Sequence, residues 1–334
     1  MSRSGKRPDM DAGALEALAG RLKASPALAA KADIGIVAAR LGLAQGAVPV
    51  GDDCAAIPDG DGHLLFAAEG FISAFVDVDP WFAGWCGVMV NLSDVAAMGG
   101  RPLAVVDVVW AEGEEGAKAV LDGLRAAAAA YGVPIVGGHT NLHNCETHLA
   151  VAVLGRAGAR LLTSFHARPG DALIMVVDRR GAYRGAFDNF QAALEAPPER
   201  LRADLALLPD LAEKGLARAA KDISQGGVPG TAVMLAESSG VSIALDLDAI
   251  DSPPGVALER WLKTFPSYGF LLSVAPGNVE PVLSSFRGRG LHAASIGAVK
   301  PGSQVTLHSE GRSALLRDFG AERLMGFGAG AQAA

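Results

Sequence analysis

The chain has 334 residues, of which 50% are hydrophobic and 19% charged, so it can bury a large core, and extensive disorder is excluded. The formal net charge of −7 argues against a nucleic-acid-binding surface, because such a surface needs basic side chains to offset phosphates, and it also argues against docking on an anionic membrane. The three cysteines, Cys54, Cys86 and Cys145, form no CxxC pair, which indicates a reducing compartment without disulfides or a zinc site.

The first residues, MSRSGKRPDMDAG, are basic but have no apolar stretch behind them, so they do not have the pattern of a signal peptide. The longest uncharged run, residues 126–145, is interrupted by glycines and a proline and could not span a bilayer. We therefore expect a cytoplasmic protein with neither a nucleic-acid partner nor a membrane partner.

In the first half of the chain, leucines at helical spacing predict a helix over residues 13–23, and a second helix is expected over 27–41, ending near Gly42. Residues 48–71, VPVGDDCAAIPDGDGHLLFAAEGF, then alternate short apolar runs with Gly and Asp clusters, as strands and loops do. The elements expected next are a helix from Trp81 to Met98 stopped by Gly99–Gly100, a strand at Leu103–Val109, a helix ending at Tyr131–Gly132, and strands at 133–136 and 147–157.

The second half begins with SFHARPGDALIMVV (164–177), which predicts a hinge followed by a strand. Helices are expected around residues 201–220, 229–238 and 278–287, and strands near 241–246, 269–275, 292–299 and 304–308. This alternation of strands and helices predicts α/β or α+β layers. The final GFGAGAQAA predicts a frayed tail.

Two acidic segments in the first half suit a hard divalent cation. In GDD, Gly51 permits a tight backbone, and the adjacent carboxylates of Asp52 and Asp53 repel each other unless a cation or solvent relieves them. Mg²⁺ favours such oxygens together with substrate phosphates. The other interpretation is a surface Asx turn. Glu69, within an apolar strand, either has a buried partner or faces water at the end of the strand.

The helix expected over residues 83–98 carries Asn91 and Asp94 three residues apart on one face. These two side chains could bind a charged ligand. Asp94 could equally be a paired core residue or an exposed one, and the helix alone does not decide between these interpretations.

The segment GGHT follows a predicted strand. Gly137 and Gly138 would let backbone N–H groups approach an anion, and Thr140 adds a hydroxyl. His139 could be a ligand, a base or a structural histidine. The chain has neither a Walker A lysine pattern nor a GxGxxG fingerprint, so a standard P-loop or Rossmann site is excluded.

Two segments of the second half could contact an anion or an acceptor. Asp222 and Ser224 precede a Gly-Gly pair that opens a helix, which suits an anion at the helix N-terminus or simple capping. Arg179 and Arg180, in DRRGAYRG, could bind a carboxylate or phosphate, or could belong to a solvated basic loop.

The order of these motifs is more specific than any one of them. GDD, an acidic residue in a strand, NLSDVAAMGGRP, GGHT, GD and DISQG follow one another between about residues 33 and 308. The series resembles the superfamily of aminoimidazole ribonucleotide (AIR) synthase, thiamine-monophosphate kinase, selenophosphate synthetase and the hydrogenase-maturation dehydratase. The chain is most similar to the group called AIR synthase-related proteins.

That resemblance implies a two-domain α/β (α+β) fold in which N-terminal domains pair into a shared β-barrel in a homodimer. It implies an N-terminal helical segment (1–32), an N-terminal ATP- and Mg²⁺-binding domain (33–158), a C-terminal domain (159–325) and a flexible tail (326–334). The roles that it implies are metal ligation by Asp52, Asp53, Glu69 and Asp94, and ATP contacts by Gly51, Asn91, Gly137, Gly138 and Thr140. On the acceptor side we expect Asp222 and His139 in catalysis and Arg179, Arg180 and Ser224 on the substrate.

Departures from the family pattern bear on the reaction. His139 and Gln225 stand where thiamine-monophosphate kinases have aspartates. The segment FPSYGFLLSV contains no acidic residue. No cysteine precedes Cys54, and none lies at the end of the chain. We expect an ATP- and Mg²⁺-dependent enzyme that transfers the γ-phosphoryl group to an oxygen of a small-molecule acceptor, as a kinase or to activate an amide-type oxygen. The alternatives are a non-catalytic nucleotide-binding or partner protein and, secondly, a thiamine-monophosphate kinase-like activity.

Overall fold

The structure, a computed structural model, describes residues 10–43, 48–185 and 187–328. The helices are α1 (Ala12–Lys23), α2 (Pro26–Ala29), α3 (Ala32–Leu41), α4 (Ser73–Val78), α5 (Pro80–Ala97), α6 (Gly113–Tyr131), α7 (Pro198–Leu205), α8 (Leu207–Glu213), α9 (Gly227–Ser239), α10 (Leu258–Leu262) and α11 (Val279–Arg287). The strands of the first half are β1 (Ala55–Asp59), β2 (Gly62–Phe71), β3 (Arg101–Glu112), β4 (Ile135–Asn141) and β5 (His143–Ala157). Those of the second half are β6 (Ala172–Val177), β7 (Ala182–Tyr183), β8 (Asn189–Gln191), β9 (Ala219–Asp222), β10 (Ser242–Asp246), β11 (Phe265–Pro266), β12 (Gly269–Val274), β13 (His292–Lys300), β14 (Gln304–Ser309) and β15 (Arg312–Asp318).

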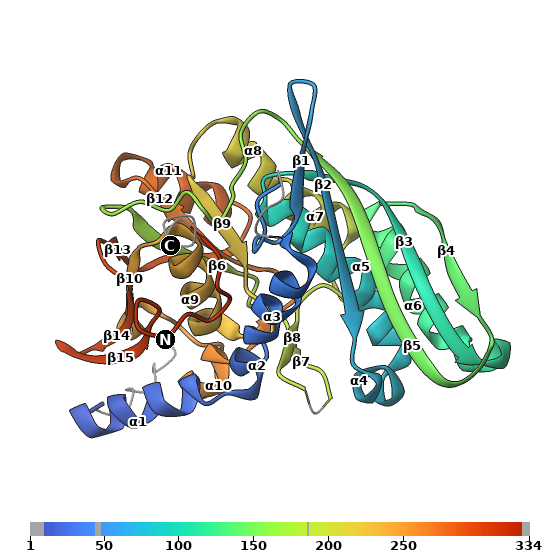
Figure 1. Cartoon of the computed structure of the whole chain (residues 1–334), viewed down its shortest axis with the longest axis horizontal. Coiled ribbons are helices and arrows are strands. Elements are labelled where there is room, and N and C mark those ends of the chain that lie inside the picture. The colour runs from blue at the N-terminus through green and yellow to red at the C-terminus, as the bar shows by residue number, and fades with distance from the viewer. Residues whose placement is uncertain (1–9, 44–47, 186, 329–334) are drawn as a thin grey trace.

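The first half is a five-stranded sheet in the order β1-β2-β5-β3-β4, with α5 and α6 on one face (Figure 1). Alternation along β3 sends Val105, Val109 and Ala111 toward the helices, where all three are buried. Helix α5 is apolar almost all round, and 15 of its 18 residues are buried, so it lies at the centre of this half. The chain then turns tightly into β3 at Gly99, whose φ of +77° favours glycine.

The other face of this sheet is apolar, and no described part of the chain covers it. Val106, Val108 and Trp110 of β3 are each 38% exposed, and Phe66 of β2 and Leu154 of β5 are 52% and 38% exposed. The register pairs Phe66 with Leu154 and Trp110 with His148, so these side chains share one face across three strands. An exposed apolar surface of this extent is typical of an interaction site.

The second half contains a seven-stranded sheet in the order β15-β14-β10-β13-β6-β12-β9 and a small three-stranded sheet in the order β11-β8-β7. The N-terminal helix α1 crosses to this half and packs against β15, so the start of the chain lies beside its C-terminal strands (Figure 1). The two halves meet where α5 contacts β9. One buried apolar cluster runs across this junction, from Leu92 of α5 to Phe270 of β12.

The structure confirms the predicted helices that became α1, α5, α6, α9 and α11 to within a few residues. It differs at residues 27–41, where α2 and α3 are separate, and at 201–220, where α7 and α8 end at Glu213 and Ala219–Asp222 form β9. The segment GGHT, expected to follow a strand, is itself part of β4, which continues through Asn141. In the predicted tail, the Gly326 N–H donates to the buried Glu237, and residues 329–334 lie outside the described part of the chain.

Two further expectations concern the membrane and the cysteines. Within the described residues, every helix is too short or too polar to cross a bilayer. Cys54, Cys86 and Cys145 are all free thiols, the first two buried and the third exposed.

Candidate functional site

A cavity of about 370 Å³ lies where the two halves meet, a size that suits a small-molecule ligand. Its wall contains five carboxylates and two lysines, together with apolar side chains from both halves. The residues predicted from the sequence that line it are Gly51, Asp52, Asp53, Glu69, Asp94, Asp222 and Ser224. This cavity is therefore the place where most of the predicted polar residues gather.

Asp53, Asp94 and Asp222 form the centre of this wall. Each offers a carboxylate oxygen, and the three oxygens lie within 4.8 Å of one another. Asp53 precedes β1, Asp94 lies in α5 and Asp222 ends β9, so the three residues come from both halves of the chain. Asp222, which we expected on the acceptor side, is a member of the acidic cluster, and its catalytic role stays a prediction.

Electrostatics make this cluster unfavourable without a cation. Burial raises the pKa of Asp53 to about 7, although the neighbouring Lys221 ammonium opposes the shift. Burial and then repulsion from Asp222 raise the pKa of Asp94 well above its usual value, and burial also raises the pKa of Asp222. A divalent cation would relieve both the burial cost and the repulsion.

Lys221 and Lys31 are the two lysines of the cavity, and the sequence analysis singled out neither. Lys221 Nζ donates to Asp53 Oδ1, and the Lys221 side chain is 6% exposed. Burial lowers the pKa of Lys221, but attraction from Asp53, Asp52 and Asp222 outweighs it and raises the pKa overall. The ammonium group is therefore charged and fixed against the acidic cluster.

Asp52, for which metal ligation stays a prediction, accepts hydrogen bonds from the linker between the two halves. Its Oδ2 accepts hydrogen bonds from Thr163 Oγ1 at 2.5 Å and from Ser164 N at 2.9 Å, and its Oδ1 accepts from Ser164 Oγ at 2.7 Å and from Asp53 N at 3.0 Å. A carboxylate has about four lone-pair sites, and all of them are used here. Asp52 thus ties the GDD segment to the linker between the halves, and it is not part of the three-carboxylate cluster.

Three other predicted residues, Glu69, Gly51 and Ser224, also lie on the cavity wall. Glu69 points from the helix-facing side of β2 and keeps solvent access. Gly51 has a φ of +103°, and a Cβ there would lie 3.0 Å from the ring of Phe327, so both the backbone and the space require glycine. Ser224 lies just before α9, which starts at Gly227 without a side-chain cap.

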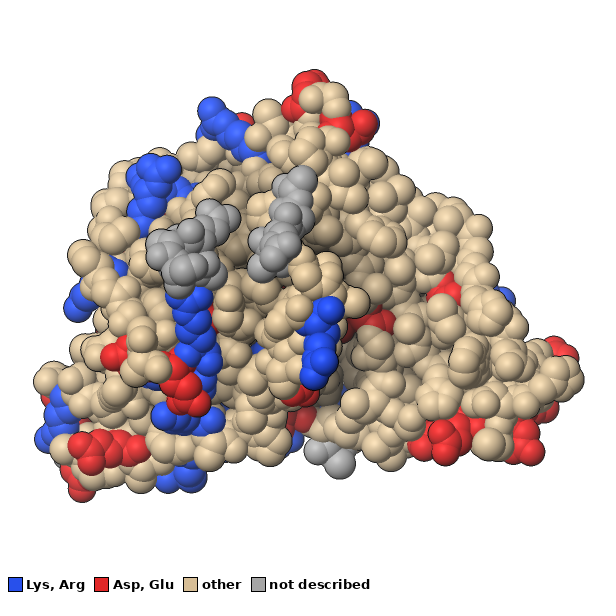
Figure 2. Space-filling view, in the orientation of Figure 1, with Lys and Arg blue, Asp and Glu red and all other residues tan. Residues whose placement is uncertain are grey.

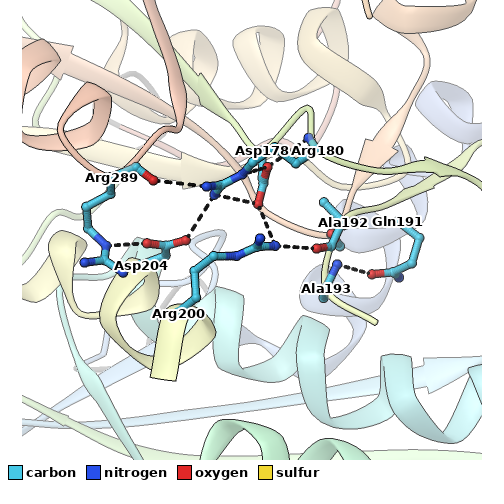
Figure 3. Close-up of polar contacts among 9 residues, drawn as sticks. Asp178, Arg180, Gln191, Ala192, Ala193, Arg200, Asp204 and Arg289 are labelled. Carbon is cyan, nitrogen blue, oxygen red and sulfur yellow. Dashed lines mark hydrogen bonds and ion pairs between the residues drawn. The ribbon is translucent and has the colours of Figure 1, made fainter. Parts of the chain in front are cut away.

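Arg179 and Arg180, expected on the substrate, are not among the residues that line the cavity, so their contact with a substrate stays a prediction. Arg180 donates to both oxygens of Asp178 and also to Asp204, and Arg289 donates to Asp204 (Figure 3). The two aspartates are buried, so their charges need these arginines. Arg179 donates instead to the Asp251 carbonyl at 3.3 Å.

Residues 137–140 also lie away from the acidic cluster. They occupy the exposed edge strand β4, three strands from Glu69 in the order of the sheet. Val108 pairs with His139, which therefore shares the uncovered apolar face and lies edge-on to Trp110, with ring centroids 6.5 Å apart. Within a single chain, then, Gly137, Gly138, His139 and Thr140 do not line the cavity.

Asn91 is fully buried beside the cavity wall and is not part of it. Its Nδ2 donates to the Gly87 carbonyl one turn earlier at 2.8 Å, while its Oδ1 has no hydrogen-bond partner. A buried amide oxygen without a partner is costly in a folded protein, so Asn91 is a polar group that its own chain leaves half satisfied.

Both ends of the described chain help to close the cavity. Lys31 and Ile34 of the N-terminal helices line it, and so does Met325 from the C-terminal segment. Met325 is held by Glu237, whose buried carboxylate accepts from the backbone N–H groups of residues 324–326 at 2.7–3.0 Å. Alternation and motif patterns carry no signal for such a contact, because it joins segments 87–89 residues apart.

Charges elsewhere on the surface are mixed. In Figure 2, basic side chains of the described residues are scattered over this face among acidic and uncharged ones. The carboxylates of the cavity are therefore a local feature, and their oxygens are the ligands that a hard divalent cation prefers.

The chain is similar to a known protein family in both of its halves. Residues 51–157 match the N-terminal domain, and residues 168–310 the C-terminal domain, of the family described as AIR synthase related protein. An uncharacterised protein of Synechocystis is 49% identical over 282 residues, covering 84% of this chain and 87% of that one. A selenide, water dikinase of Geobacter metallireducens is 30% identical over 294 residues (75% and 84% covered), and a thiamine-monophosphate kinase of Pyrococcus horikoshii is 33% identical over 213 residues (60% and 67% covered).

Solved structures share the two-domain arrangement. AaThiL complexed with AMPPCP and TMP superposes with a TM-score of 0.63 at 20% identity, covering 84% of this chain and 94% of that one. T. maritima PurL complexed with ATP superposes with a TM-score of 0.69 at 19% identity, and this chain, 84% covered, spans about half of it (48%). These likenesses support the mixed α/β two-domain fold that the sequence predicted.

Proposed function

The chain belongs to the AIR synthase related protein family, and on that premise we propose that it is an enzyme that uses ATP and Mg²⁺ to transfer the γ-phosphoryl group to an oxygen of a small-molecule acceptor. The transfer either yields a phosphate ester or activates an amide-type oxygen for loss. Relatives named as a selenide, water dikinase and a thiamine-monophosphate kinase support this class of reaction.

One observation carries the proposal: three buried carboxylates from both halves of the chain converge within 4.8 Å in the wall of a ligand-sized cavity. Mg²⁺, when bound, would neutralise negative charge on the phosphate oxygens of ATP. Asp53, Asp94 and Asp222 would hold the ion. Lys31 adds a positive charge to the same wall, and the uncapped start of α9 directs the positive end of the helix dipole toward a phosphate.

The proposal is tested by two measurements in sequence. Calorimetry should detect ATP binding that depends on Mg²⁺, and a coupled assay should then detect ADP release when a panel of small-molecule acceptors is supplied. ATP binding without ADP release for any acceptor would favour the alternative of a nucleotide-binding protein without catalysis. Absence of Mg²⁺-dependent ATP binding would contradict both.

We further propose that two copies pair through the uncovered apolar face of the first sheet. The face carries Val106, Val108 and Trp110 of β3 together with the partly exposed Phe66 of β2 and Leu154 of β5. It is continuous with the cavity, because Gly70–Ile72 border both the cavity and an apolar groove of about 470 Å³. A second copy would cover this groove, and the two sheets would form the shared barrel that the family resemblance implies.

Replacing Val108 with aspartate is expected to convert the dimer into a monomer. A carboxylate at the centre of the apolar face is buried twice in a symmetric dimer, so association should weaken by roughly 100-fold or more. Size-exclusion chromatography with light scattering measures the change. Leu315→Asp, at a 53% exposed leucine of β15, is the matched control and should leave the mass unchanged. A dimeric Val108→Asp variant would rule out this face as the interface.

Stabilisation by Mg²⁺ should grow as the pH rises through about 7. The folded-state pKa of Asp53 is raised to about 7, so in the metal-free protein its contribution to stability is present at acidic pH and is lost as the pH rises through that value. Above it Asp53 is ionised, and Mg²⁺ has more repulsion to relieve. Thermal melts with Mg²⁺ and with EDTA, at matched ionic strength from about pH 5.5 to about pH 8.5, measure the difference. A difference that is constant or larger at acidic pH would contradict the cluster as the metal site.

A further inference from the structure

Lys221 is the one lysine among the buried residues of the described chain, and it lies in an unusual place. It belongs to β9, next to Asp222, and its ammonium donates to Oδ1 of Asp53, a member of the three-carboxylate cluster. Burying an ammonium group is expensive unless carboxylates surround it. Here Asp53 is its direct partner, and both residues line the cavity with Asp52 and Asp222.

The pairing divides the oxygens of Asp53 between two tasks. Oδ1 accepts from Lys221, while Oδ2 accepts from the Asp222 backbone N–H at 3.3 Å. Asp52 has no lone pair to spare, because it accepts four hydrogen bonds. The Lys221 ammonium, a cation that belongs to the chain itself, therefore already neutralises negative charge between Asp52, Asp53 and β9.

We infer that the Lys221 ammonium group is a built-in substitute for one divalent ion. The acidic site therefore needs one metal ion fewer than it would without the Lys221 charge, and it is assembled before any metal binds. This inference rests on the proposed function for the identity of the site. A fixed ammonium satisfies the carboxylate charge without the dehydration that Mg²⁺ resists. It also costs no binding step, because the fold itself places it. Lys221 is a positioning residue for Asp53 in this account.

The test compares the wild-type chain with Lys221→Met, which removes the charge and keeps much of the length. Mn²⁺ is the probe, and its stoichiometry is measured by electron paramagnetic resonance without ATP. We expect Lys221→Met to bind one Mn²⁺ more per chain than the wild type. We also expect it to melt several degrees lower in EDTA and to recover most of that loss when Mn²⁺ is added. Lys221→Arg, which keeps the charge, should retain the wild-type stoichiometry.

Two further variants keep the test decisive. Lys221→Gln serves if the methionine variant does not fold, and Lys263→Met removes a lysine whose side chain is 34% exposed, outside the cavity. Unchanged Mn²⁺ stoichiometry in the neutral Lys221 variants, or a loss of stability that Mn²⁺ does not reduce, would overturn the inference. Failure of the wild type to bind Mg²⁺ and ATP together would overturn the proposed function alone, because the additional Mn²⁺ in the variant is measured without nucleotide.

Discussion

Replacing Asp94 with asparagine is expected to lower Mg²⁺-dependent ADP release by on the order of 10²–10³-fold. Asp94 supplies one of three carboxylate oxygens that lie within 4.8 Å of one another, and its side chain is buried in the wall of the cavity. Asparagine keeps an oxygen of similar position but loses the charge that a hard divalent cation requires. The same variant should bind Mn²⁺ more weakly in a titration without nucleotide.

The stability of the Asp94→Asn variant separates this role from a structural one. Burial and neighbouring carboxylates raise the pKa of Asp94 well above its usual value, so its ionised form is unfavourable in the metal-free fold. The neutral asparagine should therefore melt at the wild-type temperature or above it in EDTA, while losing stabilisation by Mg²⁺. Asp210→Asn, at a partly exposed carboxylate paired with Arg101, is the control and should change neither property. Wild-type turnover in Asp94→Asn would remove Asp94 from the metal site.

The sequence was sufficient for the long helices and for grouping the GDD segment with Asp94. Periodicity located α1, α5 and α6 because each has a long pattern of apolar residues, and a glycine lies just beyond the end of α5 and of α6. The order of the motifs, rather than any single one, indicated that the GDD segment and Asp94 belong together. The structure brings both to one cavity, although they lie more than forty residues apart in the sequence.

What the sequence could not predict depends on contacts between distant segments. Arg180 has the same local pattern whether it binds a substrate or two buried aspartates, and only the fold brings Asp204 to it. The Gly137–Gly138 pair has the pattern of a turn, but Gly138 pairs with Asp107 of β3 and the strand continues past an irregularity at Gly137. Lys221 follows two alanines and has no motif of its own, so its partner Asp53, 168 residues away, is visible only in the structure.

Replacing Asp52 with alanine is the second change with a large expected effect, and the property that it lowers is stability. Asp52→Ala removes four hydrogen-bond acceptances and leaves the Ser164 N–H and two hydroxyls without their partner, so the free energy of unfolding should fall by roughly 3 kcal/mol. Chemical denaturation measures this change. Asp61→Asn, at a fully exposed carboxylate, is the control and should stay within about 0.5 kcal/mol of the wild type.

Metal binding by the Asp52 variant decides between the two roles that this residue has been given. The sequence resemblance implied that Asp52 is a ligand, whereas its hydrogen bonds assign it to the linker at Thr163 and Ser164. Asp52→Asn keeps the shape of the side chain and should retain the wild-type Mn²⁺ stoichiometry, with affinity reduced by about tenfold through misplacement of Asp53. Loss of a whole Mn²⁺ ion, with little loss of stability, would instead make Asp52 a direct ligand. The opposite pattern would mean that the two aspartates of the GDD segment have different roles: Asp52 holds the two halves together, and Asp53 faces the ion.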